Sequence, residues 1–325
     1  MSKAPKGIAN LGNTCFLNAS LQVLCRMSSF TEFVLTKEIV NPSRQEQLLL
    51  SNFKEVLTLL KDSNGLLSPR GVLHAVQSIS NDFPENEPAD IAEFLLFFIQ
   101  SIHSCFAKTK KVTYSGIPQN AVDNMAIACY QLLVKTFENY SELMDIFQGV
   151  YVSRITSQTE MKDHPELFFI LDLPIPSKPS INIYDCLDLF VAPETLDGEN
   201  AWRNAKGRLE AIEKQLLFWS FPPILIICLK RFSQDGSKNS AFIAFPQELD
   251  LRPYTSGYRA SEYEYELQGV CNHIGNKDGG HYTSFVKEDQ WFHCDDEVIQ
   301  EVNEPNQVIT STAYCLIYQK KNISR

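Results

Sequence analysis

The chain has 325 residues, of which 44% are hydrophobic and 21% charged, so it has ordinary globular composition and can bury a sizeable core. Its formal net charge of −10 argues against nucleic-acid binding, since phosphate backbones are held by clustered lysine and arginine. No run of 18 apolar residues is present, so we expect no membrane span, and the polar residues 1–6 lack the apolar core of a secretion signal.

Helical and extended patterns follow one another along the chain. Apolar spacing predicts helices at residues 17–24, at 91–102, and at 122–129 with an extension towards 137. Residues 108–118 are expected to be a loop. Beyond about residue 149, runs of β-branched and aromatic residues predict strands at 167–173, 224–232, 263–270, 281–286 and 314–318. Residues 183–190 and 204–217 keep a helical pattern. We therefore expect an α+β fold, with a cleft between a helical and a β-rich lobe.

Nine cysteines are present, and none belongs to a Cys-x-x-Cys pair, so the sequence has no zinc-ribbon or thioredoxin-like motif. Several lie in apolar runs, as Cys228 does, and we expect buried free thiols in a reducing compartment. These thiols and the missing signal favour the cytoplasm or the nucleus. Core packing is the default role of each cysteine, so a chemical role must come from its surroundings.

Cys15 stands where a turn-rich segment runs into the first predicted helix. Thr14 is placed to cap that helix, which puts Cys15 in its first turn. The partial positive charge of a helix N-terminus favours the reactive thiolate, and the free N–H groups there can hold a developing oxyanion. The amide of Asn10 could be a second oxyanion donor. On this local pattern alone, a mere packing role for Cys15 has equal weight.

A candidate base lies far downstream. His281 follows two glycines and begins a predicted strand, and a tight turn over residues 287–290 would bring Asp295 back beside it. A carboxylate there would orient the imidazole and stabilise its cationic form. Successive strand residues face opposite sides, so Asp295 and Asp296 cannot both point at His281. The alternatives are a surface histidine and a turn pair of acids. For His273 we expect a structural role.

Two long segments carry a family resemblance. Residues 10–18, Asn-Leu-Gly-Asn-Thr-Cys-Phe-Leu-Asn, resemble the cysteine box of ubiquitin-specific proteases, and residues 265–296 resemble their histidine box. The segments 225–232, 245–251 and 313–318 resemble further blocks of the same family, so the resemblance spans nearly the whole chain.

The resemblance implies a papain-like fold of thumb, fingers and palm. The chain would be a single catalytic domain with the thumb over residues 1–148, the fingers and adjoining palm over 149–215, and the palm over 216–325. It also implies hydrolysis of the peptide or isopeptide bond after the C-terminal glycine of ubiquitin, without a cofactor. We expect a monomer whose partners are ubiquitin and its conjugates, and which binds neither nucleic acid nor membrane.

By the same resemblance, Cys15 is the nucleophile, and His281 is the general base and later the general acid. Asp295 is the implied orienting acid, with Asp296 as its alternative. Asn10 is the implied oxyanion donor.

A site for the basic tail of ubiquitin is implied as well, made by Asp90, Glu93, Phe232 and Tyr282. The two acids match a family box that opens a thumb helix, but Pro and Ala at residues 88–89 replace its glutamines. The alternative for both acids is the general preference of carboxylates for the first turn of a helix.

Many relatives hold zinc in the fingers through two Cys-x-x-Cys pairs. The matching stretches here, residues 154–158 and 202–206, contain no cysteine. Since a closed zinc site of this type needs four ligands, we expect no metal and a finger region held by packing around Trp202.

Three functions remain open from the sequence. The first is an active deubiquitinase. The second is a protease with the same chemistry for another ubiquitin-like modifier, and the third is a catalytically silent ubiquitin-binding protein.

Overall fold

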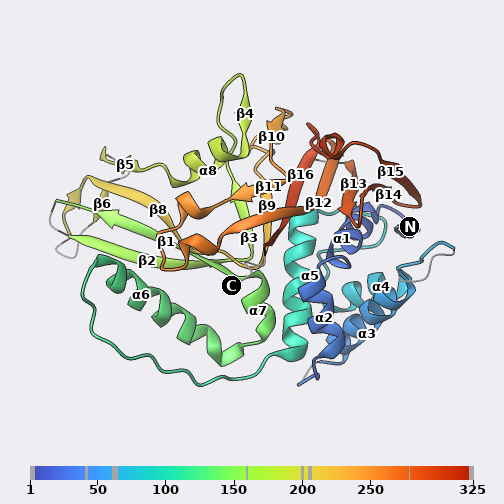
Figure 1. Cartoon of the computed structure of the whole chain (residues 1–325), viewed down its shortest axis with the longest axis horizontal. Coiled ribbons are helices and arrows are strands. Elements are labelled where there is room, and N and C mark those ends of the chain that lie inside the picture. The colour runs from blue at the N-terminus through green and yellow to red at the C-terminus, as the bar shows by residue number, and fades with distance from the viewer. Residues whose placement is uncertain are drawn as a thin grey trace.

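The computed structural model describes residues 4–40, 43–60, 65–158, 160–198, 201–203, 207–277 and 279–321. The first half of the chain is helical (Figure 1), with α1 (Cys15–Leu24), α2 (Ser28–Thr36), α3 (Arg44–Leu59), α4 (Arg70–Ile79), α5 (Ile91–Phe106), α6 (Ala121–Thr136) and α7 (Glu142–Phe147). The helices predicted at residues 17–24, 91–102 and 122–129 are confirmed, as is the loop at 108–118.

Helix α1 runs through the interior and joins the helices to the main sheet. Every one of its residues is buried, and it packs against α5 and against the strands β12 (Glu264–Gly275) and β13 (Gly280–Lys287). A helix buried on all sides has no solvent-facing stripe for polar residues. Asn18 and Gln22 therefore bond within the protein, and Gln22 donates to the backbone oxygen of Lys6 at 2.8 Å.

The main sheet has the strand order β15-β14-β13-β12-β16-β9-β3. Its neighbouring strands are antiparallel, except that β3 and β9 are parallel. The bounds of the other strands are β3 (Ile170–Leu173), β9 (Ile224–Leu229), β14 (Trp291–Asp295), β15 (Val298–Val302) and β16 (Ala313–Lys320), and β11 (Glu248–Asp250) pairs with β12. The predicted strands are confirmed, although the one expected at 167–173 is divided at Phe169 and the one expected at 224–232 ends at Leu229.

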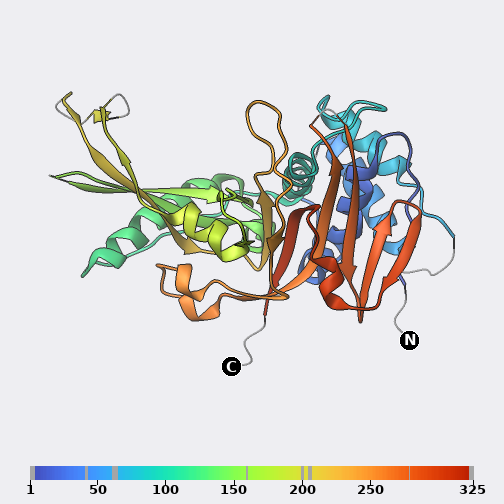
Figure 2. The same cartoon turned by 90° about the horizontal axis from the view of Figure 1, so that it is seen from above.

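A second sheet extends away from α1–α5 (Figure 2). Its order is β2 (Met161–Phe168), β1 (Gly149–Thr156), β8 (Ile212–Ser220) and β5 (Glu194–Leu196). The helical pattern expected at 204–217 is wrong where the structure describes it, because β8 pairs along its length with β1 and also with β5. Strand pairing here overrides a local helical spacing; residues 204–206 lie outside the described part of the chain.

One further α-helix and four short strands complete the described part of the fold. The helix predicted at 183–190 is confirmed as α8 (Ile183–Val191). The other strands are β4 (Ile181–Asn182), β6 (Trp202–Arg203), β7 (Leu209–Glu210) and β10 (Ile243–Ala244). Helix α6 packs on the second sheet through Met125 and Cys129, which lie in one apolar cluster with Val152 and Trp219. Among the described residues, no helix is long and apolar enough to cross a membrane. The observed fold is thus the α+β class predicted from the sequence.

Candidate active site

The turn before α1 depends on two residues with left-handed backbone conformation. Gly12 has a φ of 103° and Asn13 a φ of 53°, which reverse the chain just before the helix begins at Cys15. Thr14 occupies the N-cap position but does not cap the helix. Its Oγ1 accepts a hydrogen bond from the N–H of Leu11 at 2.9 Å. The predicted cap is therefore wrong, because Thr14 stabilises the turn instead.

The thiol of Cys15 lies inside the protein, with 4% of the residue exposed. Burial raises its pKa, a backbone hydrogen bond at Tyr282 lowers it, and the carboxylate of Asp296 raises it again; the net shift is upward. The backbone N–H groups of Phe16 and Cys15 in the first turn do lower the pKa, as expected at a helix N-terminus, but burial outweighs them. The thiol therefore lies against the backbone of Tyr282, the residue that follows His281 on the same strand.

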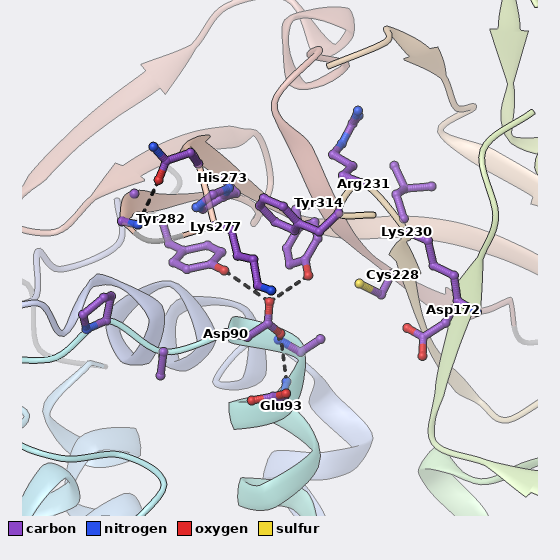
Figure 3. Close-up of a pocket in the computed structure, with 18 residues that line it drawn as sticks. Asp90, Glu93, Asp172, Cys228, Lys230, Arg231, His273, Lys277, Tyr282 and Tyr314 are labelled. Carbon is purple, nitrogen blue, oxygen red and sulfur yellow. Dashed lines mark hydrogen bonds between the residues drawn. The ribbon is translucent and has the colours of Figure 1, made fainter. Parts of the chain in front are cut away.

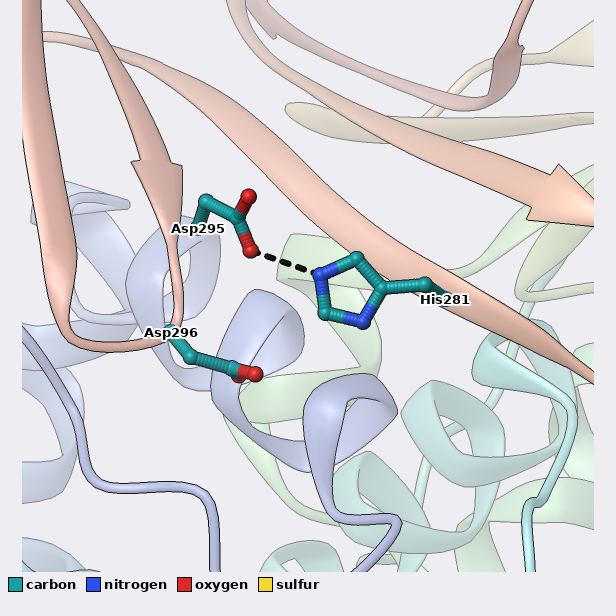
Figure 4. Close-up of side chains that lie close together, drawn as sticks. All are labelled: His281, Asp295 and Asp296. Atoms are coloured by element: carbon teal, nitrogen blue, oxygen red, sulfur yellow. Dashed lines mark hydrogen bonds and ion pairs between the residues drawn. The ribbon is translucent and has the colours of Figure 1, made fainter.

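His281 lies at the start of β13, and the hairpin from β13 to β14 brings Asp295 back to it (Figure 4). Nε2 of His281 and Oδ1 of Asp295 are 2.6 Å apart. The turn predicted at 287–290 forms this hairpin, since β13 ends at Lys287 and β14 begins at Trp291. Because Asp295 engages Nε2, Nδ1 is the ring nitrogen left to exchange a proton with another group.

Asp296 has a different set of partners from Asp295. It has a φ of 48° in the turn after β14, and its carboxylate accepts hydrogen bonds from Nδ2 of Asn10 at 2.7 Å and Nδ2 of Asn18 at 2.8 Å. The alternative in which Asp296 orients His281 therefore disagrees with the observed hydrogen bonds.

Asn10 is fixed at both ends of its side-chain amide. Its Oδ1 accepts hydrogen bonds from the N–H groups of Gly12 at 3.0 Å and Thr14 at 3.3 Å, while its Nδ2 donates to Asp296. An amide nitrogen carries two hydrogens, so one bond to Asp296 leaves a second donor. The assigned orientation gives Asn10 one hydrogen for a further acceptor.

Among the residues the structure describes, His281, Asp295 and Asp296 are the one group of three possible metal ligands whose ligand atoms lie within 4.8 Å of one another. Their ligand atoms are already engaged, by the bond between His281 and Asp295 and by the two asparagine amides on Asp296. A hydrogen-bonded network accounts for this cluster.

A groove of about 490 Å³ lies between the start of α5 and the main sheet (Figure 3). The four residues predicted for the ubiquitin tail, Asp90, Glu93, Phe232 and Tyr282, all line it, together with His273. The buried ring of His273 lies against Tyr282, with ring centroids 4.7 Å apart, and against Phe232 at 5.5 Å. The groove thus ends at the strand that carries His281.

Asp90 is bonded from two sides. Its Oδ1 caps α5 by accepting from the N–H groups of Ala92 at 2.8 Å and Glu93 at 3.1 Å. Its Oδ2 accepts from the hydroxyl of Tyr314 at 2.7 Å and, at 3.5 Å, from that of Tyr282 (Figure 3). The carboxylate of Asp90 is therefore used within the protein, whereas Glu93 is exposed.

Sequence reasoning assigned no site role to Tyr314 or Asn18. A register shift between β12 and β16, where Cys271 pairs with Cys315 but Asn272 with Ala313, makes Tyr314 an extra residue. A bulge of this kind is not visible in a two-residue alternation. Asn18 could have been noticed in the sequence, because a polar residue within an apolar helix needs hydrogen-bond partners when it is buried.

The second sheet has an ion pair in one stretch where many relatives are expected to carry cysteines. Arg154 binds Asp163 through two hydrogen bonds, of 2.7 and 2.9 Å, between β1 and β2. Nζ of Lys162 lies 4.9 Å from the ring centroid of Trp202. In the second stretch, residues 204–206 lie outside the described part of the chain.

Comparison with known proteins places this architecture in a family. The chain is 29% identical to ubiquitin carboxyl-terminal hydrolase Usp2 of Drosophila melanogaster, over 97% of this chain and 34% of that protein. It is 30% identical to ubiquitin carboxyl-terminal hydrolase 2 of Homo sapiens, over 98% and 56%, and 27% identical to ubiquitin carboxyl-terminal hydrolase 5 of Saccharomyces cerevisiae, over 97% and 44%. The chain thus spans 34% to 56% of the length of these relatives. The family model of ubiquitin carboxyl-terminal hydrolase matches residues 6–318, and the chain therefore belongs to this family.

Proposed function

We propose that the protein is a deubiquitinase, a cysteine hydrolase that cleaves the peptide or isopeptide bond after the C-terminal glycine of ubiquitin. The observation that carries the proposal is the 2.6 Å bond between Asp295 and His281, on the strand whose backbone at Tyr282 contacts the buried thiol of Cys15. Thiol-dependent acyl transfer requires a nucleophile, a base and an acid that orients the base, and these three residue types come together here.

In this proposal His281 takes the proton of Cys15 through Nδ1, and the thiolate attacks the carbonyl carbon of the glycine. The imidazolium, stabilised by Asp295, then protonates the leaving amine, and the acyl-enzyme is hydrolysed by water that His281 activates. The raised pKa of Cys15 means that this proton must be removed by a base. Asn10, held by Asp296, would donate its second amide hydrogen to the oxyanion.

The groove between α5 and the sheet is the proposed channel for the ubiquitin tail. Exposed Glu93 would meet its basic side chains, and Phe232 and Tyr282 would form apolar walls. Asp90 would act by holding α5 and Tyr314 in place rather than by contacting the tail alone.

The further assignments extend the family pattern to this chain. We assign residues 1–148 to the thumb, 149–215 to the fingers and adjoining palm, and 216–325 to the palm. The enzyme would act as a monomer on ubiquitin conjugates, without bound metal. It would reside in the cytoplasm or nucleus, where its free thiols stay reduced.

The test is a panel of modifiers, each ending in an electrophile that traps an active thiol. We expect covalent labelling by ubiquitin, loss of labelling in Cys15→Ala, and retention in Cys25→Ala, which removes the half-buried thiol at the other end of α1. Labelling by a different ubiquitin-like modifier alone would support the second function. A folded protein that binds ubiquitin and is labelled by none would contradict the enzymatic proposal.

A further inference from the structure

Lys238 joins two segments at the edge of the groove. Its ammonium group donates hydrogen bonds to the backbone oxygens of His273, at 2.8 Å, and Gly275, at 3.1 Å. Its own segment follows β9 and returns to form a β-bridge with Phe232, and Nζ lies 5.8 Å from the centroid of the Phe232 ring. Lys238 is half-buried, and this burial lowers its pKa. This setting is unusual for a lysine, since most lysines are exposed to solvent.

Lys238 binds carbonyl groups at the end of β12, beyond the point where β12 pairs with β16. β12 pairs with β13 as far as Gly275, but its pairing with β16 ends at Asn272. The N–H of His273 still bonds to the oxygen of Thr312 at 2.8 Å, so His273 faces the β16 side. In a strand, a residue's carbonyl points to the same side as its N–H, and so does the carbonyl two residues on. The ammonium group of Lys238 therefore occupies the place of the missing strand and satisfies two orphaned carbonyls.

These two carbonyls lie on either side of Ile274, the residue that pairs with His281, the proposed base. In the ladder of β12 and β13, His273 is opposite Tyr282, Ile274 is opposite His281, and Gly275 is opposite Gly280. Lys238 thus holds the residues on either side of the partner of His281. We propose that Lys238 is a positioning residue, which fixes this end of β12 and so keeps His281 aligned with Cys15; the proposal rests on the assigned role of His281.

The base of the Lys238 segment has its own anchor. Arg231 is 1% exposed and donates to the backbone oxygens of Ala313 at 2.7 Å, Asn239 at 2.9 Å and Ala241 at 2.9 Å. Removal of the ammonium group from Lys238 should therefore leave the segment attached and the fold intact. What is lost is the support of the β12 edge.

The test compares Lys238→Met, which keeps the chain length but removes the donors, with Lys238→Arg, which keeps charge and donors. Lys37→Met is the matched control, because Lys37 makes an exposed ion pair with Glu142 at 3.1 Å, in the helical half of the chain. We would measure kcat and KM on a ubiquitin C-terminal amide, thermal unfolding, and the pH dependence of Cys15 alkylation by iodoacetamide, followed on the Cys15 peptide by mass spectrometry.

For Lys238→Met we expect a loss in kcat of about 10- to 100-fold at nearly constant KM, as for other small misplacements of a catalytic group. Alkylation of Cys15 near neutral pH should fall towards that of His281→Ala, and Lys238→Arg should recover most of both rates. A kcat within twofold of Lys37→Met, or a loss explained entirely by unfolded protein, would overturn the proposal. If wild type fails to cleave ubiquitin, the proposed function falls separately. The positioning role then stands or falls with the alkylation profile, since an unchanged profile in Lys238→Met refutes it.

Discussion

Asp90 has two structural roles, as helix cap and as hydrogen-bond acceptor, and their contributions to stability can be measured separately. It caps α5 through the N–H groups of Ala92 and Glu93, and it accepts a hydrogen bond from the hydroxyl of Tyr314. Tyr314 is 7% exposed, so its hydroxyl has little access to water. Asp90→Ala removes both the cap and the acceptor.

The expected cost follows from adding the two contributions. Loss of a helix cap costs about 1 kcal/mol, and a buried hydroxyl left unsatisfied costs about 1–3 kcal/mol, so Asp90→Ala should lower the free energy of unfolding by about 2–4 kcal/mol. At roughly 2 °C per kcal/mol for a chain of this size, Tm should fall by roughly 4–8 °C. Ser43→Ala is the matched control, because Ser43 caps α3 through Glu46 at an exposed site. It should cost about 1 kcal/mol, the cap contribution alone.

Urea unfolding of wild type, the two alanine variants, Tyr314→Phe and the double variant Asp90→Ala/Tyr314→Phe gives the assay. In the Tyr314→Phe background the hydroxyl at 2.7 Å from Asp90 is already gone, and only the 3.5 Å hydrogen bond from Tyr282 remains to be lost. Asp90→Ala should then cost little more than Ser43→Ala. The double-variant cycle should therefore show clear non-additivity. Equal costs for Asp90→Ala and Ser43→Ala in the wild-type background, or strict additivity of Asp90→Ala and Tyr314→Phe, would refute the two-sided role of Asp90.

Three further predictions concern the proposed catalytic residues and the ion pair between β1 and β2. Because the charge of Asp296 raises the pKa of Cys15, Asp296→Asn should move the midpoint of Cys15 alkylation to lower pH, yet reduce turnover by releasing the oxyanion donor; an unmoved midpoint would contradict this. His281→Ala should lower kcat at least about 100-fold while ubiquitin still binds, and Asp295→Ala should cost less. A wild-type rate in either variant would remove that residue from the mechanism. Arg154→Ala should destabilise the protein to urea by about 1.5–3 kcal/mol, because the bidentate partner is left half-buried; a loss below about 0.5 kcal/mol would indicate an ordinary surface pair.

The contact between His281 and Asp295 was predictable because each step depends on short-range rules. A strand beginning after two glycines, a tight turn and a two-residue alternation bring one of two adjacent acids back to the histidine. The strand bounds and the hairpin turn agree with this reasoning. The choice between Asp295 and Asp296 needed the structure, because the left-handed conformation of Asp296 ends the alternation at that point.

Features that depend on burial or on distant partners were beyond the sequence. The helical spacing at residues 204–217 gave no sign that β8 pairs with β1 and β5. The bulge at Tyr314, whose hydroxyl bonds to Asp90, results from the register shift between β12 and β16. For Cys15 the helix N-terminus and its effect on the thiolate were predictable, but the sign of the net pKa shift was not. That sign is set by how much protein surrounds the thiol, which a local pattern does not contain.

The raised pKa of Cys15 bears on the proposed roles of both Asp295 and Asp296. Burial and Asp296 favour the neutral thiol, which becomes a nucleophile when a base takes its proton. In the proposed mechanism this base is His281, so reactivity depends on its position. Asp295 binds Nε2 of His281, which leaves Nδ1 to accept the proton. Asp296 opposes ionisation of the resting thiol, and its carboxylate also accepts a hydrogen bond from Asn10. In the proposal, the amide of Asn10 acts later, when negative charge has moved to the substrate oxygen. In the proposed mechanism the two neighbouring carboxylates thus act at successive stages of one reaction, because the left-handed conformation of Asp296 turns them towards different partners.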